Sequence, residues 1–160
     1  ANMTIHDEWV RHPTGKIGKG SWCEVCGRYN ARNVVVHALV VRDGRLLMIQ
    51  RGHDPMKGWW ALPAGYADWN ETMEQCALRE LKEETGVKGK VLSLLGIYDD
   101  PKRDEDGRQN IGVTYVVEIE GDPRVIEEVT AVKWFELDKL PDRIAFDHRK
   151  MIEDYEKRFC

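Results

Sequence analysis

The sequence contains no apolar run long enough to cross a membrane and no pattern typical of a secretory signal peptide. A membrane-spanning helix needs about 20 consecutive apolar residues, and a signal peptide needs a short apolar core behind a basic start. We therefore expect no membrane partner and a cytoplasmic location. Cysteine is also scarce, because the 160 residues contain four, which is too few to predict a disulfide scaffold.

The chain also lacks a strong excess of charge of either sign. Its 24 Lys and Arg residues stand against 28 Asp and Glu residues, which gives a formal net charge of −4. This balance argues against a protein that binds nucleic acid through bulk electrostatics. It is compatible with a local metal site that binds a small anion. A hydrophobic content of 42% and a charged content of 32% are typical of one globular domain.

Residues 1–32 lack regular hydrophobic periodicity, so they predict an appendage of loops with at most one short strand. Cys23 and Cys26 form one CxxC pair, which is half of a zinc ribbon, and the second pair is missing. His6 and His12 are candidate further ligands, although their spacing matches no familiar zinc pattern. Two interpretations stay open: zinc bound to a partial zinc-ribbon remnant, and a tight turn after Cys26.

Residues 33–160 predict one domain of mixed strands and two helices. The segment 34–41 is rich enough in β-branched residues to form a central strand, and Asp43-Gly44 predicts a hairpin turn into a second strand. Further strands are expected at 59–62, 90–98, 111–119 and 131–137, with a turn at 63–65, a long hairpin loop at 99–110 and a C-terminal helix within 146–159. This order predicts an α/β sandwich.

The most informative segment runs from Gly65 to Val87, where a glycine-containing turn leads into a helix. Thr72 is a good N-cap, and Gln75, three residues later, completes a capping box. Gly86 stands where a glycine commonly ends a helix. The segment therefore predicts a helix with a defined start and a defined end.

Three glutamates lie together on one face of this helix. Steps of three and four residues return to the same side, so Glu80, Glu83 and Glu84 project together. Ala77 and Leu81 fall on the opposite side, which predicts a core face. Clustered carboxylates repel one another unless a cation neutralises them, and Mg²⁺ prefers oxygen ligands. The pattern indicates metal-assisted attack of water on a phosphate.

The same segment resembles the Nudix box, whose pattern is Gx5Ex7REUxEExGU with U an aliphatic residue. Nine residues fill the defined positions: Gly65, Glu71, Arg79, Glu80, Leu81, Glu83, Glu84, Gly86 and Val87. The resemblance covers roughly residues 33–158. It implies a Nudix-type α/β/α sandwich with a mixed sheet and the catalytic helix packed on it, so that 33–160 is a Nudix hydrolase domain.

Nudix enzymes hydrolyse a nucleoside diphosphate linked to another moiety. By this resemblance, Glu80, Glu83 and Glu84 bind Mg²⁺ or Mn²⁺, and the carbonyl of Ala64 is a further ligand.

The resemblance also implies roles for catalytic residues that are not metal ligands. Glu71 and Arg79 are expected to pair and to orient the loop and the helix. The general base in relatives is either a box glutamate or a glutamate from a later loop. Glu127 and Glu128 lie in such a loop, and spacing favours Glu128, although both glutamates are also compatible with solvated loop residues.

Two segments outside the box resemble small ADP-ribose pyrophosphatases. They are Gly-Ile-Tyr-Asp-Asp-Pro-Lys-Arg-Asp at 96–104 and Ile-Ala-Phe-Asp-His at 144–148. They imply hydrolysis of ADP-ribose to AMP and ribose 5-phosphate. The residues expected near the substrate are Tyr98, Asp99, Arg103 and Phe146.

Alternatives to ADP-ribose hydrolysis stay open. FAD and dNTPs are competing substrates. A module that binds ADP-ribose without cleaving it is a third reading, although such relatives usually lose a box glutamate or gain a DNA-binding domain. His37, inside an apolar strand, is expected to be a core or pocket-edge residue, and His148 a pocket-wall or capping residue. Family members of this size often form homodimers, which we expect here too.

Overall fold

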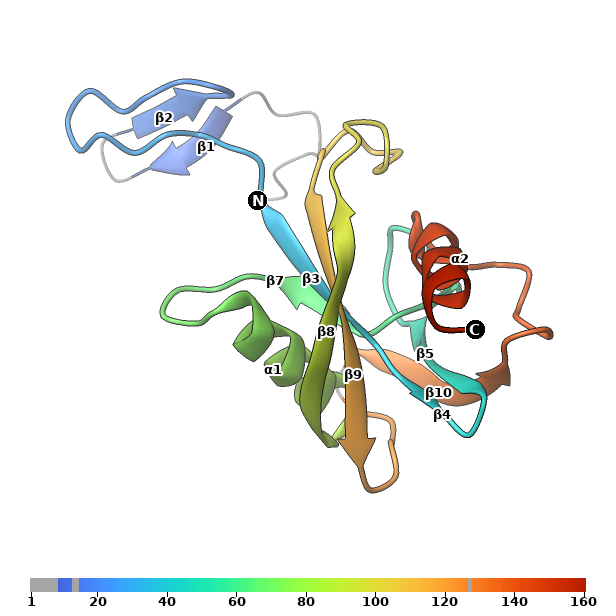
Figure 1. Ribbon diagram of the computed structural model, residues 1–160. Helices are drawn as coiled ribbons and strands as arrows, with labels where there is room; N and C mark the ends of the chain where they lie inside the picture. Colours follow the sequence, from blue (N-terminus) through green and yellow to red (C-terminus); the bar gives the residue numbers. More distant parts are fainter. Residues whose placement is uncertain (1–8, 13–14, 127) are drawn as a thin grey trace.

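The computed structural model describes residues 9–12, 15–126 and 128–160 (Figure 1). His6 and Glu127, considered above as a zinc ligand and a base, lie outside these ranges. The elements are β1 (Trp9–His12), β2 (Gly15–Gly18), β3 (Val34–Leu39), β4 (Val41–Arg42), β5 (Arg45–Arg51), β6 (Trp60–Ala61), β7 (Ala64–Tyr66), α1 (Met73–Thr85), β8 (Lys88–Tyr98), β9 (Ile111–Glu120), β10 (Val129–Glu136) and α2 (His148–Phe159). Neither helix in the described ranges is long and apolar enough to cross a membrane.

Two sheets form the centre of the molecule. The first has the strand order β7-β3-β9-β8, in which β3 runs parallel to β9 and the other pairs are antiparallel. The second has the order β10-β5-β4, with β6 also paired to β5, and all its pairs are antiparallel. The first sheet is therefore mixed, as the sequence predicted.

The two helices lie on opposite sides of the mixed sheet (Figure 1). Successive side chains of a strand point to opposite faces, and β3 uses both. Val36 and Ala38 contribute to clusters with residues of α1, whereas Leu39 belongs to the cluster that contains Met151 and Ile152 of α2. Burial of both faces explains why β3 is a nearly continuous apolar run. The predicted α/β/α sandwich is confirmed.

Local sequence signals predicted two features of the fold correctly, a hairpin turn and the ends of α1. Asp43 and Gly44 both adopt positive φ, and Arg42 pairs with Arg45 across them, as in a two-residue hairpin. Helix α1 begins after Thr72, whose side chain and that of Gln75 form the expected capping box. The helix ends at Gly86 in the left-handed conformation, with φ of 77°.

The structure differs from the sequence expectation at 63–65. The sequence predicted only a turn there, but β7 pairs antiparallel with β3, so that His37 faces Ala64 and Val35 faces Tyr66. The pairing gives the short segment its strand geometry, and a partner so distant in the chain has no local signal. As a result, the first residues of the box are attached to the central strand.

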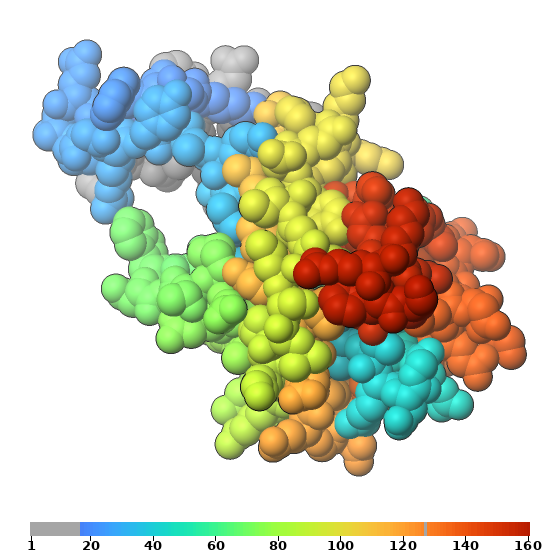
Figure 2. Space-filling model, viewed as in Figure 1, coloured from blue at the N-terminus to red at the C-terminus, as the bar shows by residue number. Residues whose placement is uncertain are grey.

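The N-terminal segment also differs from the expectation of loops with at most one strand. β1 and β2 pair antiparallel as a hairpin, and Trp22 bridges Tyr29 around the CxxC turn. Residues 17–32 extend to one side of the main body (Figure 2), where the Arg28 guanidinium lies 5.8 Å from the Trp69 ring centre. The boundary between an appendage at 1–32 and a domain at 33–160 stays a prediction.

The CxxC segment is a tight turn in which the N–H of Gly27 donates to the carbonyl of Cys23. The Cys23 side chain is buried and that of Cys26 is exposed. Among the residues described, no three His, Cys, Asp or Glu side chains are arranged to hold a metal ion. Zinc at Cys23 and Cys26 therefore has no support from the described residues.

Candidate functional site

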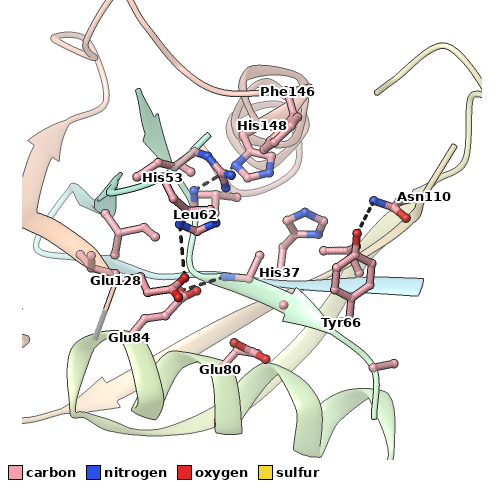
Figure 3. A pocket seen from close by; sticks show the side chains of 18 of the residues that line it. His37, His53, Leu62, Tyr66, Glu80, Glu84, Asn110, Glu128, Phe146 and His148 are labelled. Carbon is pink, nitrogen blue, oxygen red and sulfur yellow. Dashed lines mark hydrogen bonds and ion pairs between the residues drawn. The ribbon is translucent and has the colours of Figure 1, made fainter. Parts of the chain in front are cut away.

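A pocket of about 590 Å³ lies beside the central strand and the first turns of the box. Its lining comes from β3, β5, β7, α1, the 99–110 loop, the start of β10 and the start of α2. Among the residues expected to bind metal or substrate or to take part in catalysis, seven line it: Ala64, Arg79, Glu80, Glu84, Arg103, Glu128 and Phe146. Gly65 of the box and the two histidines, His37 and His148, line it as well. Figure 3 shows Glu80 and Glu84 on one side of the pocket, Asn110 and Tyr66 on another, and His37 between them.

The carboxylate end of the pocket depends on close approach between α1 and β7. The backbone N–H of Ala64 donates to Oε2 of Glu84 at 3.1 Å. A Cβ atom at Gly65 would overlap the Glu80 carboxylate, so glycine is required where the strand passes the helix. Burial and the neighbouring Glu80 raise the pKa of Glu84 well above its usual range. Burial likewise raises the pKa of Glu80. Burial thus favours the neutral form of both carboxyls relative to an exposed glutamate, and a bound divalent cation would oppose that shift.

Arg79 holds the acidic cluster together from one side. Its guanidinium donates to Glu71 through two bonds of 2.8 Å, to Glu80 at 2.8 Å and to Glu83 at 3.2 Å. It also donates to the carbonyl of Tyr66 at 3.1 Å, which ties α1 to β7. The two-bond pair with Arg79 lowers the pKa of Glu71 to about 2. The structure brings Glu71 and Arg79 together, although Glu71 does not line the pocket.

The donor set fits a divalent cation that binds oxygen. Glu80 and Glu84 line the pocket next to Ala64, whereas Glu83 lies on the outer side of the cluster with 42% of its side chain exposed. In the part of the chain that is described, three carboxylates do not already converge on one point. Mg²⁺ commonly uses one or two protein carboxylates and completes its shell with waters and substrate phosphates. Such a cation would also relieve the repulsion that raises the pKa of Glu84.

Glu128 lies in the turn immediately before β10 and lines the same pocket as Glu80 and Glu84. Its Oε2 is 3.3 Å from Nδ1 of His53, and both side chains are largely exposed. Gly52 passes so close to the Glu128 backbone that a Cβ atom would overlap its carbonyl oxygen. This contact fixes where the Glu128 backbone meets the pocket, while the carboxylate stays accessible to water.

Arg103 reaches the pocket from the 99–110 loop, but its charge is already compensated. Its guanidinium donates to Asp147 through bonds of 2.9 and 2.7 Å, and its side chain is 4% exposed. Asp104, whose side chain is 3% exposed, lies 3.7 Å away. The sequence expectation placed Arg103 near the substrate. Pairing of Arg103 with a substrate phosphate is unfavourable, because two adjacent carboxylates already make the local charge negative.

Phe146 lies among cationic side chains at the pocket wall. The guanidinium carbons of Arg51 and Arg108 are 4.9 and 5.9 Å from its ring centre. The Phe146 backbone has φ of 54°, which is uncommon for an aromatic residue, and its N–H donates to Sδ of Met56 at 3.3 Å. Aromatic faces attract guanidinium groups, so Phe146 holds two positive charges at the pocket.

Tyr98 and Asp99, which were expected near the substrate, are not among the residues that line this pocket. The Tyr98 hydroxyl donates to Asp154 of α2 at 2.9 Å, and its ring packs against the core. Asp99 is exposed, and its carbonyl accepts a bond from Arg32 at 2.8 Å. The end of β8 directs Tyr98 toward α2, where its hydroxyl bonds to the partly buried Asp154.

Two buried histidines form the floor of the pocket. His37 and His148 are 1% and 2% exposed, and their rings meet edge to face at 4.8 Å. Nδ1 of His148 accepts the N–H of Leu62 at 3.0 Å, which fixes the ring. Burial lowers the pKa of His37 to about 4, and it lowers the pKa of His148 as well. Both rings are therefore neutral near neutral pH.

The buried histidines predict a loss of stability in acid. The folded-state pKa of His37, about 4, lies below its ordinary value of 6.5, so the unfolded chain binds the proton first as pH falls. We therefore compare the unmodified protein with His37→Phe, which cannot bind this proton. The free energy of unfolding of the unmodified protein, minus that of the variant, should rise by up to ~1.4 kcal/mol per pH unit from about pH 4 to pH 6.5. Urea unfolding of both proteins across this range measures it. Thr114 lies opposite His37 in the sheet, so Thr114→Val is a control whose unfolding free energy should depend on pH as that of the unmodified protein does. If His37→Phe also showed this same pH dependence, the lowered pKa of His37 would be contradicted.

Several lining residues were not identified from the sequence. Arg51 ends β5, Asn110 precedes β9, and Tyr66 ends β7. A polar residue at the end of an apolar strand was a usable signal for Arg51 and Asn110, since such ends meet at the edges of a sheet. Tyr66 had no such signal, because β7 itself was not predicted.

Comparison with known proteins extends these observations. The sequence model of the protein family described as NUDIX domain matches residues 30–155 of this chain. A protein of Methanocaldococcus jannaschii named ADP-ribose pyrophosphatase is 40% identical over 123 residues, which are 76% of this chain and 72% of that protein.

Solved structures agree with this relationship. A MutT NUDIX hydrolase from Burkholderia pseudomallei superposes with a TM-score of 0.71 at 35% identity, over 77% of this chain and 97% of the other. The NUDIX domain of NrtR from Shewanella oneidensis, solved with ADP ribose, gives a TM-score of 0.71 at 29% identity, over 82% of this chain and 91% of the other. With Gly65, Arg79, Glu80 and Glu84 of the box lining one pocket and the fold shared with these structures, this chain belongs to the Nudix family of pyrophosphohydrolases.

Proposed function

We propose that this protein hydrolyses ADP-ribose to AMP and ribose 5-phosphate with the help of Mg²⁺ or Mn²⁺. The observation that carries the proposal is the polarity of one continuous pocket. Glu80 and Glu84 make one part acidic, Arg51 and Arg108 add positive charge at Phe146, and His37 lines a neutral polar floor. The diphosphate of ADP-ribose suits the metal ligands and the arginines, and its terminal sugar suits the neutral polar floor. The name of the Methanocaldococcus jannaschii relative supports the same substrate.

Glu80, Glu83, Glu84 and the carbonyl of Ala64 would hold the cation. When bound, it supplies positive charge that screens the diphosphate and lowers the pKa of a coordinated water. Arg79 keeps Glu71, Glu80 and Glu83 in a fixed arrangement through the bonds described above. Fixed ligands reduce the reorganisation that the reaction needs.

Glu128 is our candidate for the general base. Its carboxylate is accessible and lines the pocket, with His53 at 3.3 Å. In the proposed step, the water oxygen forms a bond to one phosphorus and the bridging P–O bond breaks. The water proton passes to the base, and the leaving phosphate keeps the bridging oxygen. Arg51 and Arg108 are placed to stabilise charge on the diphosphate.

A substrate panel tests the proposal. The purified protein is incubated with Mg²⁺ and, separately, with ADP-ribose, FAD, NADH, diadenosine polyphosphates or dNTPs, and products are separated by chromatography. We expect AMP and ribose 5-phosphate to form fastest from ADP-ribose. Faster cleavage of FAD or of a dNTP would contradict the substrate and keep the Nudix reaction.

A non-catalytic sensor of ADP-ribose is the competing function. The NUDIX domain of NrtR, a protein solved with ADP ribose, has the same fold. This chain keeps every box glutamate, which favours catalysis. Binding of ADP-ribose without any cleavage in the panel would favour the sensor. The homodimer and the cytoplasmic location stay predictions.

A further inference from the structure

Two buried polar atoms in the pocket have neither a hydrogen-bond nor an ion-pair partner among the residues described, whereas Nε of Arg108, also without a hydrogen bond, lies 2.7 Å from Asp106. The two atoms are Nδ1 of His37 and Oδ1 of Asn110. His37 is 1% exposed and Asn110 is 3% exposed, and both line the pocket. An unpaired buried polar atom costs about 1–3 kcal/mol in a folded protein. Two such atoms in one cavity indicate that a ligand supplies the missing partners.

The bonds around Asn110 define which kind of partner is missing. Its Nδ2 donates to the Tyr66 hydroxyl at 3.1 Å, and its backbone N–H donates to Asp104 at 2.6 Å. These bonds orient the amide so that Oδ1 is an acceptor without a donor. The ring of His37 bonds to the backbone of Val113, and Nδ1 is left as the acceptor of a neutral ring. The ligand must therefore bring two hydrogen-bond donors.

The charges nearby exclude a phosphate as that ligand. Arg103 and His37 both lie over Gly112. A Cβ atom added to that glycine would be 3.2 Å from each of their side chains. The charge of Arg103 is balanced by Asp147 and Asp104. Arg108, which donates to the same Tyr66 hydroxyl as Asn110, is paired with Asp106 at 2.7 Å, and the two atoms without a partner are acceptors that would repel phosphate oxygens. Hydroxyl groups are neutral donors and fit two acceptors better than any anion does.

We propose that His37 and Asn110 form a subsite for the terminal ribose of ADP-ribose, in which Nδ1 and Oδ1 accept hydrogen bonds from two ribose hydroxyls. This inference rests on the proposed function. The adenosine ribose is a poorer candidate, because it lies between a phosphate and the base, and a buried floor would have to hold the base as well. The terminal ribose is a free end of the substrate. The subsite selects ADP-ribose over diphosphates whose second group has no hydroxyls.

The test compares ADP-ribose with ADP esterified to tetrahydrofurfuryl alcohol, which keeps the ring and the diphosphate and lacks the hydroxyls. We expect the unmodified protein to favour ADP-ribose in kcat/KM by roughly tenfold or more. His37→Phe and Asn110→Leu should each reduce this preference by roughly fivefold, with the rate for the ester nearly unchanged. Equal losses on both substrates would overturn the subsite.

Two further variants separate recognition from packing. His37→Asn keeps a polar group near the position of Nδ1 and should retain more of the preference than His37→Phe. Thr114→Val is the matched control, since Thr114 is fully buried beside His37, bonds to Met151 and does not line the pocket. Its preference should equal that of the unmodified protein. Loss of preference in Thr114→Val would show that any change in this layer has the same effect, and would overturn the assignment.

Calorimetry with products tests the subsite without turnover. Ribose 5-phosphate should bind the unmodified protein more tightly than tetrahydrofurfuryl phosphate, and Asn110→Leu should remove the difference. If the protein hydrolyses neither diphosphate but keeps this difference, the proposed function fails and the subsite stands. If the variants weaken AMP instead of ribose 5-phosphate, the pocket floor holds the adenosine end and the subsite assignment is wrong. Equal binding of both phosphates to the unmodified protein would also overturn it.

Discussion

Glu84→Gln should lower kcat by two to three orders of magnitude while leaving the protein folded. The Glu84 carboxylate lies at the pocket and accepts the N–H of Ala64, which a Gln carbonyl can also accept. The change therefore removes charge and keeps shape. Fixed groups that stabilise charge in the reacting complex typically account for about 10²–10³ in rate. Steady-state hydrolysis at saturating Mg²⁺ measures the loss.

The same variant should be at least as stable as the unmodified protein without metal. Burial and Glu80 raise the pKa of Glu84, so the folded state binds its proton more tightly than the unfolded state. This favourable contribution is lost as pH rises from the ordinary value of 4.5 toward the raised one. Gln avoids that loss, and the stability difference should grow with pH across this window.

Glu74→Gln provides a matched control on the same helix. Glu74 is exposed in the first turn of α1 and does not line the pocket. Its substitution should leave kcat unchanged. A Glu84→Gln protein with normal turnover at saturating Mg²⁺ would refute the metal role of Glu84, and an unfolded one would show that its carboxylate is needed for the fold.

Asp147→Ala should reduce the free energy of unfolding by ~3–5 kcal/mol. Arg103 is 4% exposed and donates two bonds to Asp147. Removal of the partner leaves a buried guanidinium with one hydrogen bond to the Asn110 carbonyl, at 3.2 Å, and with Asp104 at 3.7 Å. Denaturant unfolding measures the loss. Asp122→Ala is the control, since its ion pair with Arg42 is at the surface with the Asp122 side chain 98% exposed, and it should cost less than ~1 kcal/mol.

A double variant identifies the cause of that loss. If an uncompensated charge destabilises Asp147→Ala, then Arg103→Met combined with Asp147→Leu should recover a large part of the stability. A double variant that is as unstable as the sum of its parts would point to packing of the loop rather than to charge.

The sequence predicted those parts of the fold whose signals are local. The capping residues and the spacing of the glutamates are contained within α1, so its bounds and its acidic face followed directly. The Asp43-Gly44 turn is likewise specified by the positive φ that both residues adopt. Each of these features needs no knowledge of a distant partner.

Features that depend on distant partners were not predicted. β7 is a strand only because β3, more than 20 residues earlier in the chain, pairs with it. Tyr98 was expected near the substrate because residues 96–104 resemble a segment of ADP-ribose pyrophosphatases. In the structure its hydroxyl instead donates to Asp154, which is 56 residues away in the chain. The missing partner of Asn110 is visible only when the side chains around it are known.

The pocket is completed by the residues that are synthesised last among those that line it. Phe146 and His148 close the floor and wall, and Asp147 between them neutralises Arg103. During translation, β3 and α1 leave the ribosome long before these residues do, and domains generally acquire their packing as units. A nascent chain that ends before residue 146 therefore has the whole Nudix box and no finished binding site. In such a chain the pocket lacks part of its wall and floor, so the earlier elements depend on the packing of the two sheets and α1 rather than on a bound ligand.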